Sequence, residues 1–359
     1  MLTKSLTRSA PVDLCRKNLK GGKARAILVN SGNANAFTGK AGVASVERCG
    51  KALVAALKCR PGEVFLASTG VIGEPLPDER ITANLPALIR DLKADGWAEG
   101  AAAIMTTDTF PKLATRQAKI GDVTVTINGF CKGSGMIAPD MATMLAFVAT
   151  DAAIPAPVLR DLLARGADRS FNAITVDGDT STSDTLLLAA TGQAPKHPRP
   201  KSAGDPVLKP FRAALEDLLA DLAIQVVKDG EGAAKLVTID VTGAATARAA
   251  RRIGLAVANS PLVKTAIAGE DANWGRIVMA VGKSGEKADR DKLSIKIGGI
   301  VITEKGQRRP DYDEAPVAAH IKGRDVRIAV DVGIGKGSAR VWTCDLTHRY
   351  IEINADYRS

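Results

Sequence analysis

The sequence predicts an α/β (α+β) protein in which sheets are layered with flanking helices. Segments with helical spacing of apolar residues and segments of strand type are mixed throughout the 359 residues. Several of the strands alternate apolar and polar residues, which favours antiparallel pairing. Aromatic residues make up only 4% of the chain, so the core is expected to consist of Val, Ile, Leu and Ala. This length suits one large domain or two ordinary ones.

The composition argues against several classes of function. The net charge of +10 is spread along the chain without interleaved aromatics, so nucleic-acid binding is disfavoured, whereas anionic small substrates suit a basic surface. Five cysteines without close pairing indicate reduced thiols in a cytoplasmic compartment. With only three histidines, the chain gives little support to a metal site or a histidine-dependent triad. Neither a secretory signal nor an apolar membrane span is predicted.

The first half of the chain carries two loops that follow strands. The strand at 24–29 ends in N-S-G-N-A-N-A (30–36), whose amides face either a ligand or their own main chain. The strand at 63–68 runs into S-T-G-V-I-G (68–73), where Thr69 and Gly70 offer a hydroxyl and an unhindered N–H, as an oxyanion hole requires. Taken alone, this hexapeptide more often means a plain turn. Helices are expected at 41–57 and 78–92, and a polar loop at 104–112.

The segment Lys132–Thr150 is the centre of the hypothesis. A Gly-rich, Pro-containing loop follows the strand at 123–127 and changes abruptly into an apolar run after Thr143. That run, 144–149, is predicted to be a buried strand. A hydroxyl held at the start of a buried strand is a candidate nucleophile.

The second half offers fewer chemical signals. Residues 172–184 are predicted as a strand entering an acidic turn, in which Asp177, Asp179 and Asp184 supply hard oxygens; a hydrogen-bonded turn is favoured over a cation site, because the spacing fits no calcium loop. Glu231 lies between two glycines and is either a solvated loop residue or a group near a ligand. The remaining elements are expected as helices at 158–165, 211–227 and 245–268 with a restart at Ser260-Pro261, and as strands at 235–241, 293–303, 326–332 and 350–353.

Eight motifs, in this order, resemble the ornithine acetyltransferase family, also called the glutamate N-acetyltransferases of arginine biosynthesis. They are N-S-G-N-A-N-A at 30–36, S-T-G-V-I-G at 68–73, M-T-T-D at 105–108, K-G-S-G-M-I-A-P-D-M-A-T-M-L at 132–145, D-G-D-T-S-T at 177–182, D-G-E-G-A at 229–233, D-A-N-W-G-R at 271–276 and N-A-D-Y-R-S at 354–359. Each motif is weak alone, but eight in the same order are very specific.

The resemblance implies a self-processing fold of the N-terminal-nucleophile type, shared with related aminopeptidases. The precursor of such enzymes cuts itself before the threonine of the A-T-M-L motif, here the Ala142–Thr143 bond, giving an α chain of residues 1–142 and a β chain of residues 143–359. The freed α-amine has an unperturbed pKa of roughly 7.7–8.0 and acts as a base for the hydroxyl of Thr143. This chemistry needs no histidine.

The resemblance also implies the other site residues. Thr69 and Gly70 correspond to the oxyanion hole, and five further residues to the substrate-binding positions: Thr106, Lys132, Glu231, Asn354 and Ser359. Lys132 is expected to pair with the α-carboxylate of the substrate and Glu231 to face a positive group such as the ornithine ammonium. Thr107 is chemically equal to its neighbour Thr106.

The implied reaction transfers the acetyl group of N2-acetyl-L-ornithine through acetyl-Thr143 to L-glutamate, without a metal or cofactor. Some family members also use acetyl-CoA; the sequence leaves this open. A heterotetramer of two α and two β chains in the cytoplasm is implied. The alternatives are an N-terminal-nucleophile amidohydrolase or aminopeptidase, a truncated inactive homologue, and a non-catalytic basic binding protein.

The chain departs from the family at its beginning. Family members usually carry some tens of residues before the point that matches Met1, and residues 1–12 are expected to belong to a strand. Either the start is assigned too late or the copy is truncated; a truncated copy would expose a sheet edge.

Overall fold

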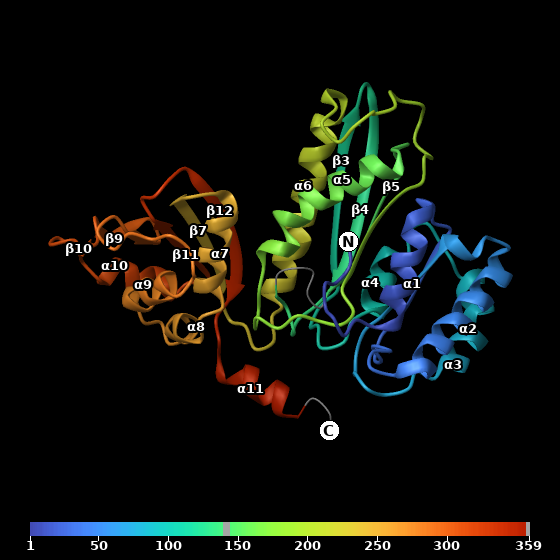
Figure 1. Cartoon of the computed structure of the whole chain (residues 1–359), viewed down its shortest axis with the longest axis horizontal. Helices are drawn as coiled ribbons and strands as arrows, with labels where there is room; N and C mark the ends of the chain where they lie inside the picture. The colour runs from blue at the N-terminus through green and yellow to red at the C-terminus, as the bar shows by residue number, and fades with distance from the viewer. Residues whose placement is uncertain (139–143, 357–359) are drawn as a thin grey trace. The chain divides into compact units, whose positions relative to one another are not determined.

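The structure is a computed structural model that describes residues 1–138 and 144–356 (Figure 1). It divides into two compact units. Unit 1 comprises residues 1–172 and 179–226, and unit 2 comprises residues 173–178 and 227–359. Thr143, Ala142 and Ser359, three residues predicted for the site, lie outside the described residues.

Unit 1 is built on two sheets in its described part. Strands β1 (Ala26–Asn30) and β2 (Val64–Ser68) form a parallel pair. A four-stranded sheet has the order β3-β4-β5-β6, in which the first three strands are antiparallel neighbours and the last pair is parallel. Its strands are β3 (Lys112–Ile120), β4 (Val123–Lys132), β5 (Leu145–Thr150) and β6 (Thr185–Ala190).

Helices flank both sheets of unit 1 (Figure 1). They are α1 (Ala10–Asn18), α2 (Gly39–Leu57), α3 (Asp78–Arg90), α4 (Trp97–Ala103), α5 (Ala156–Asp168) and α6 (Lys209–Lys228). Short 3-10 turns lie at Leu19–Gly21, Pro61–Glu63, Phe171–Ala173 and Pro206–Leu208. Leu215, Leu218, Leu219 and Leu222 recur at helical spacing on α6 and are buried. Gly129 of β4 lets this apolar face come close, because a Cβ there would lie 3.0 Å from Leu222 Cδ1.

Unit 2 contains a six-stranded sheet in the order β10-β9-β8-β11-β7-β12, in which only β11 and β7 are parallel among the described pairs. The strands are β7 (Leu236–Ala244), β8 (Ser294–Ile297), β9 (Ile300–Glu304), β10 (Gln307–Arg308), β11 (Asp325–Asp331) and β12 (Gly337–Cys344). The helices are α7 (Ala247–Ala258), α8 (Pro261–Ala268), α9 (Trp274–Gly282), α10 (Ala315–Ile321) and α11 (His348–Ala355). Layered sheets with flanking helices are thus confirmed.

Local chemistry explains the helix restart that the sequence predicts after Ala258. Helix α7 begins where the Thr246 hydroxyl accepts a hydrogen bond from Ala249 N. Pro261 opens α8, where its missing N–H costs nothing. Ile253 and Val257 of α7 are fully buried in the core of unit 2.

Four sequence predictions differ from the structure. Residues 350–353 lie in helix α11, not in a strand; Thr347 caps the helix and their alternating pattern is misleading. Residues 293–303 form a hairpin, because Gly298 and Gly299 both adopt positive φ between β8 and β9. In the N-terminal segment only Leu2 forms a bridge, to Thr185, before α1 begins. Residues 172–184 contain no strand.

Candidate active site

Lys132, the last residue of β4, joins two predicted site residues. Its side chain is buried, and its Nζ donates hydrogen bonds of 2.7 Å to Thr106 Oγ1 and 3.4 Å to Thr69 Oγ1. An ammonium group has no acceptor, so each threonine oxygen accepts and each hydroxyl keeps its own hydrogen for another acceptor. The contact also distinguishes Thr106 from its chemically equal neighbour Thr107.

Asp108 organises the cluster around Lys132 and was not identified from the sequence. Its Oδ1 accepts hydrogen bonds from Lys112 Nζ (2.6 Å) and Gly133 N (2.7 Å), and its Oδ2 lies 3.7 Å from Lys132 Nζ. The side chains of Asp108 and Lys112 are completely buried. Burial opposes the charged carboxylate, but the charges of Lys132 and Lys112 and these hydrogen bonds outweigh it and lower the pKa of Asp108. The only sequence signal was the motif M-T-T-D.

Thr69 and Gly70 follow β2 in a turn that a second loop holds in place. Thr69 N donates to Asn30 O (3.1 Å), and Val71 N donates to Gly32 O (3.2 Å). Gly70 has a φ of +127°, and a Cβ there would lie 2.2 Å from the carbonyl carbon of Gly32. Only glycine allows the two backbone segments to come this close at that φ. Among the described residues the Gly70 N–H has no hydrogen-bond partner, so it and the Thr69 hydroxyl are two available donors at one point.

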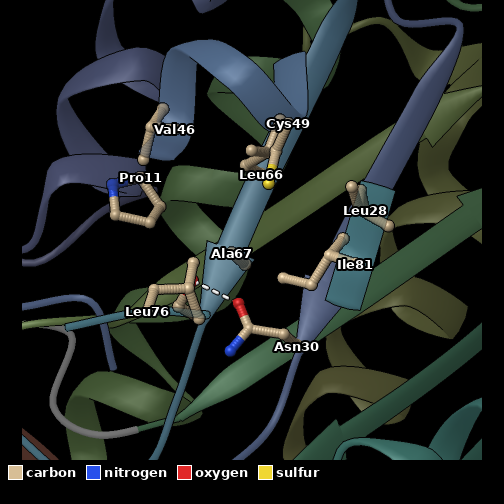
Figure 2. Close-up of a pocket in the computed structure, with 10 residues that line it drawn as sticks. Pro11, Leu28, Asn30, Val46, Cys49, Leu66, Ala67, Leu76 and Ile81 are labelled. Atoms are coloured by element: carbon tan, nitrogen blue, oxygen red, sulfur yellow. Dashed lines mark hydrogen bonds between the residues drawn. The ribbon is translucent and has the colours of Figure 1, made fainter. Parts of the chain in front are cut away.

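The side-chain amide of Asn30, in the motif N-S-G-N-A-N-A, stabilises this turn by hydrogen bonds within the protein. Asn30 Oδ1 accepts a 2.6 Å hydrogen bond from Ser68 Oγ, and Asn30 Nδ2 donates to Asn33 O at 2.8 Å. Figure 2 shows the Asn30 side chain at the border of a pocket whose other labelled residues are apolar or carry a thiol. Burial, together with the negative charge of Asp78, raises the pKa of the Cys49 thiol in this pocket to about 11. The pocket is therefore lined mainly by apolar side chains, and its polar residues Asn30 and Ser68 are hydrogen-bonded to each other.

Glu231 and Asn354 lie together in unit 2. Asn354 Nδ2 donates a 2.8 Å hydrogen bond to Glu231 Oε2, and the glutamate is buried. The loop of Glu231 is fixed against α11, because the Thr347 hydroxyl donates to Gly232 O at 2.6 Å. A Cβ on Gly232 would meet Tyr350 N at 2.5 Å, so the glycine permits this contact. The structure thus brings the predicted residues into two groups, one in each unit.

Other nucleophiles and metal ligands receive no support from the described part of the chain. All five cysteines are free, and burial raises the pKa of Cys131. No three His, Cys, Asp or Glu side chains in residues 1–138 and 144–356 are grouped as around a metal ion. In the same residues, no helix has the length and apolar character that crossing a membrane requires.

Comparisons with known proteins agree on one family. The ArgJ family model matches residues 1–359. The arginine biosynthesis bifunctional protein ArgJ of Mesorhizobium japonicum is 60% identical over all of this chain and 87% of its own length; that of Gluconobacter oxydans is 61% identical over 99% of this chain and 84% of its own. A crystal structure of the Bacillus halodurans ArgJ protein is 40% identical, with a TM-score of 0.56 over 58% of this chain and 97% of that one.

Proposed function

Since the chain belongs to the ArgJ family, we propose that Thr143 is the nucleophile of an acetyl transfer served by Lys132, Thr69 and Gly70. Membership makes the chain a glutamate N-acetyltransferase of arginine biosynthesis. The observation that supports the site most strongly is the convergence of Thr69, Thr106 and Lys132, since β4 ends there and β5 begins beside it.

The first reaction is on the chain itself. The Thr143 hydroxyl attacks the carbonyl carbon of Ala142, the peptide C–N bond breaks, and the α-amine of Thr143 leaves with a proton. Water then hydrolyses the resulting ester and restores the hydroxyl. The new amine, with an unperturbed pKa of roughly 7.7–8.0, is a suitable base near neutral pH. The products are an α chain of residues 1–142 and a β chain of residues 143–359.

The second reaction transfers the acetyl group in two steps. The Thr143 amine takes the hydroxyl proton, and Oγ attacks the acetyl carbonyl of N2-acetyl-L-ornithine. The Thr69 hydroxyl and the Gly70 N–H donate hydrogen bonds to the oxyanion that forms. Ornithine leaves as the amine after taking the proton, and the α-amine of L-glutamate then attacks acetyl-Thr143. The hydroxyl is regenerated and N-acetylglutamate is released.

The remaining site residues are proposed to bind the amino-acid part of the substrate. The buried ammonium of Lys132 suits an α-carboxylate, with Thr106 beside it. Glu231 suits the side-chain ammonium of ornithine, and its hydrogen bond from Asn354 fixes the carboxylate. Ser359 is assigned to the same role by family resemblance alone.

Ornithine release with and without glutamate tests the function. The purified protein is incubated with N2-acetyl-L-ornithine, and ornithine is measured against glutamate concentration. Release should depend on glutamate and disappear in Thr143→Ala. Release at the same rate without glutamate would instead identify a hydrolase that passes the acetyl group to water.

Acetyl-CoA is a second candidate donor, because the relatives are named bifunctional. We propose that it acetylates Thr143 as well, and N-acetylglutamate formation from acetyl-CoA without acetylornithine tests this. For the assembly we propose a heterotetramer of two α and two β chains, and for the location the cytoplasm, both from family resemblance. Sedimentation and cell fractionation test these two proposals.

A further inference from the structure

Two successive residues hold both backbone groups of Met144, the residue directly after Thr143. Asp184 Oδ1 accepts a 2.9 Å hydrogen bond from Met144 N, and Thr185 N donates a 3.1 Å hydrogen bond to Met144 O. Asp184 is completely buried, as is Thr185 at the start of β6. Thr3 N in turn donates to Asp184 O at 3.0 Å. Asp184 and Thr185 therefore hold the backbone of Met144 directly before the regular pairing of β5 with β6 begins.

The second oxygen of Asp184 is not needed for this clamp. Among the described residues Asp184 Oδ2 is buried and has no geometrically satisfactory hydrogen-bond partner. Burial raises the pKa of Asp184 well above its usual value, and the Met144 N–H and the Lys132 charge oppose this without overcoming it. The folded protein therefore favours the neutral carboxyl, which carries one hydrogen as a donor besides the oxygen that accepts from Met144.

We propose that Asp184 is a positioning residue of the acetyl transfer, which holds Met144 and thereby restricts Thr143, the residue covalently joined to it. This rests on the proposed role of Thr143. The Met144 N–H and the Thr143 carbonyl belong to the same peptide group. A shift of this group therefore moves the nucleophile with it. In this role Asp184 acts through its contact with Met144 and not through the substrate. It acts on the rate because a misplacement of about 1 Å is enough to cost ~10²-fold.

Three variants test this role: Asp184→Asn, Asp184→Ala and the matched control Asp78→Ala. Asn keeps the oxygen that accepts from Met144 and replaces the neutral O–H by a neutral N–H, whereas Ala removes both. Asp78 is a second buried carboxylate of unit 1, but its partners Arg48 and Ser45 lie on α2. Each variant is analysed for self-cleavage on a denaturing gel, for melting temperature, and for kcat and KM per mole of cut enzyme.

The proposal expects Asp184→Asn to be cut and to keep kcat within about 3-fold, while Asp184→Ala loses about 10²-fold in kcat or stays uncut, with KM changed far less. Asp78→Ala should melt at a lower temperature yet keep kcat per mole of cut enzyme. A wild-type kcat in Asp184→Ala would overturn the proposal, and so would an Asp184→Asn variant as slow as Asp184→Ala, because the negative charge would then be required.

The same measurements distinguish a variant that fails to fold, a wrong role for Thr143 and a wrong role for Asp184. If Asp184→Ala does not fold, Asp184→Ser, whose shorter side chain no longer reaches Met144 N, replaces it with the same expectation. If wild type is uncut, or Thr143→Ala keeps full activity, the role of Thr143 itself is wrong. A cut, active wild type with an unaffected Asp184→Ala contradicts only the role of Asp184.

Discussion

Lys132 and Leu145 are paired directly across β4 and β5, so the last residue of one strand faces the first residue of the next. The proposed cut between Ala142 and Thr143 falls in the connection that joins these two strands. Six residue pairs, from Ile127–Thr150 to Lys132–Leu145, join β4, which precedes that connection, to β5, which follows it. These pairs do not require the connection to be intact. Cleavage should therefore leave the sheet intact.

The two chains should consequently stay together after the cut. A purification tag on the end of the 1–142 chain should retain the 143–359 chain at equal stoichiometry, and Thr143→Ala should give one uncut band. Separation of the chains without denaturant would contradict the pairing of β4 with β5 as the element that holds them.

Gly70→Ala should abolish acetyl transfer, because the new Cβ would lie 2.2 Å from the Gly32 carbonyl carbon and a φ of +127° is strained for alanine.

Thr69→Ala removes only the hydroxyl and should lower kcat by ~10²–10³. Thr69→Ser restores the hydroxyl and should recover most of this loss. Steady-state kinetics on cut enzyme checks all three; equal kcat for the Ser and Ala variants would exclude the hydroxyl as a donor.

Lys132→Met should raise KM for acetylornithine and also lower kcat, because the ammonium contacts Thr69 as well as Thr106. Lys132→Arg should not rescue it, since the planar guanidinium cannot replace a compact ammonium among buried partners. Lys119→Met, at an exposed position of β3, is the control and should change neither constant. Unchanged kinetics in Lys132→Met would remove Lys132 from the site.

Asp108→Asn should destabilise unit 1 strongly, because it removes the carboxylate from a buried ion pair with Lys112. Breaking one partner of such a pair typically costs about 3–5 kcal/mol. Asp217→Asn breaks the exposed pair with Arg116 and should have a small effect by comparison. Melting temperatures of the two variants in the uncut Thr143→Ala background make the comparison. Equal shifts would contradict the structural importance of Asp108.

The pH dependence of stability should report the state of Asp184. Because burial raises its pKa in the folded protein, the folded state keeps a proton that the unfolded state releases above about pH 4. Its stabilising contribution is thus present at low pH and is lost as pH rises toward the folded pKa. The melting temperature of Asp184→Asn minus that of wild type, both with Thr143→Ala, should increase over this range. A difference that does not change with pH would indicate a normal pKa.

The layered fold and several candidate site residues could be predicted from the sequence because they rest on local signals. The Thr-Gly turn after a strand, the hydroxyl-rich M-T-T-D loop and Glu231 between glycines are each readable in a few residues. The roles of these residues came from family resemblance. The contacts of Lys132 with Thr69 and of Asn354 with Glu231 were not predicted, because sequence spacing does not give tertiary contacts.

The features that were missed depend on tertiary packing. Lys112 was placed in a polar loop from the sequence, and the buried carboxylate of Asp108 is what balances the charge of its buried ammonium. Asp184 resembled one oxygen donor among several in an acidic turn, yet it contacts Met144, 40 residues away. Residues 350–353 alternate apolar and polar side chains like a strand. They form a helix that Thr347 caps and that packs against Gly232.

Intact-mass spectrometry of the protein after incubation with N2-acetyl-L-ornithine tests the central claim most directly. The 143–359 chain should gain the mass of one acetyl group, located on Thr143 by fragmentation, and lose it when glutamate is added. The 1–142 chain should not change. An active enzyme whose 143–359 chain never carries the acetyl group, under quenching that preserves esters, would contradict Thr143 as the nucleophile.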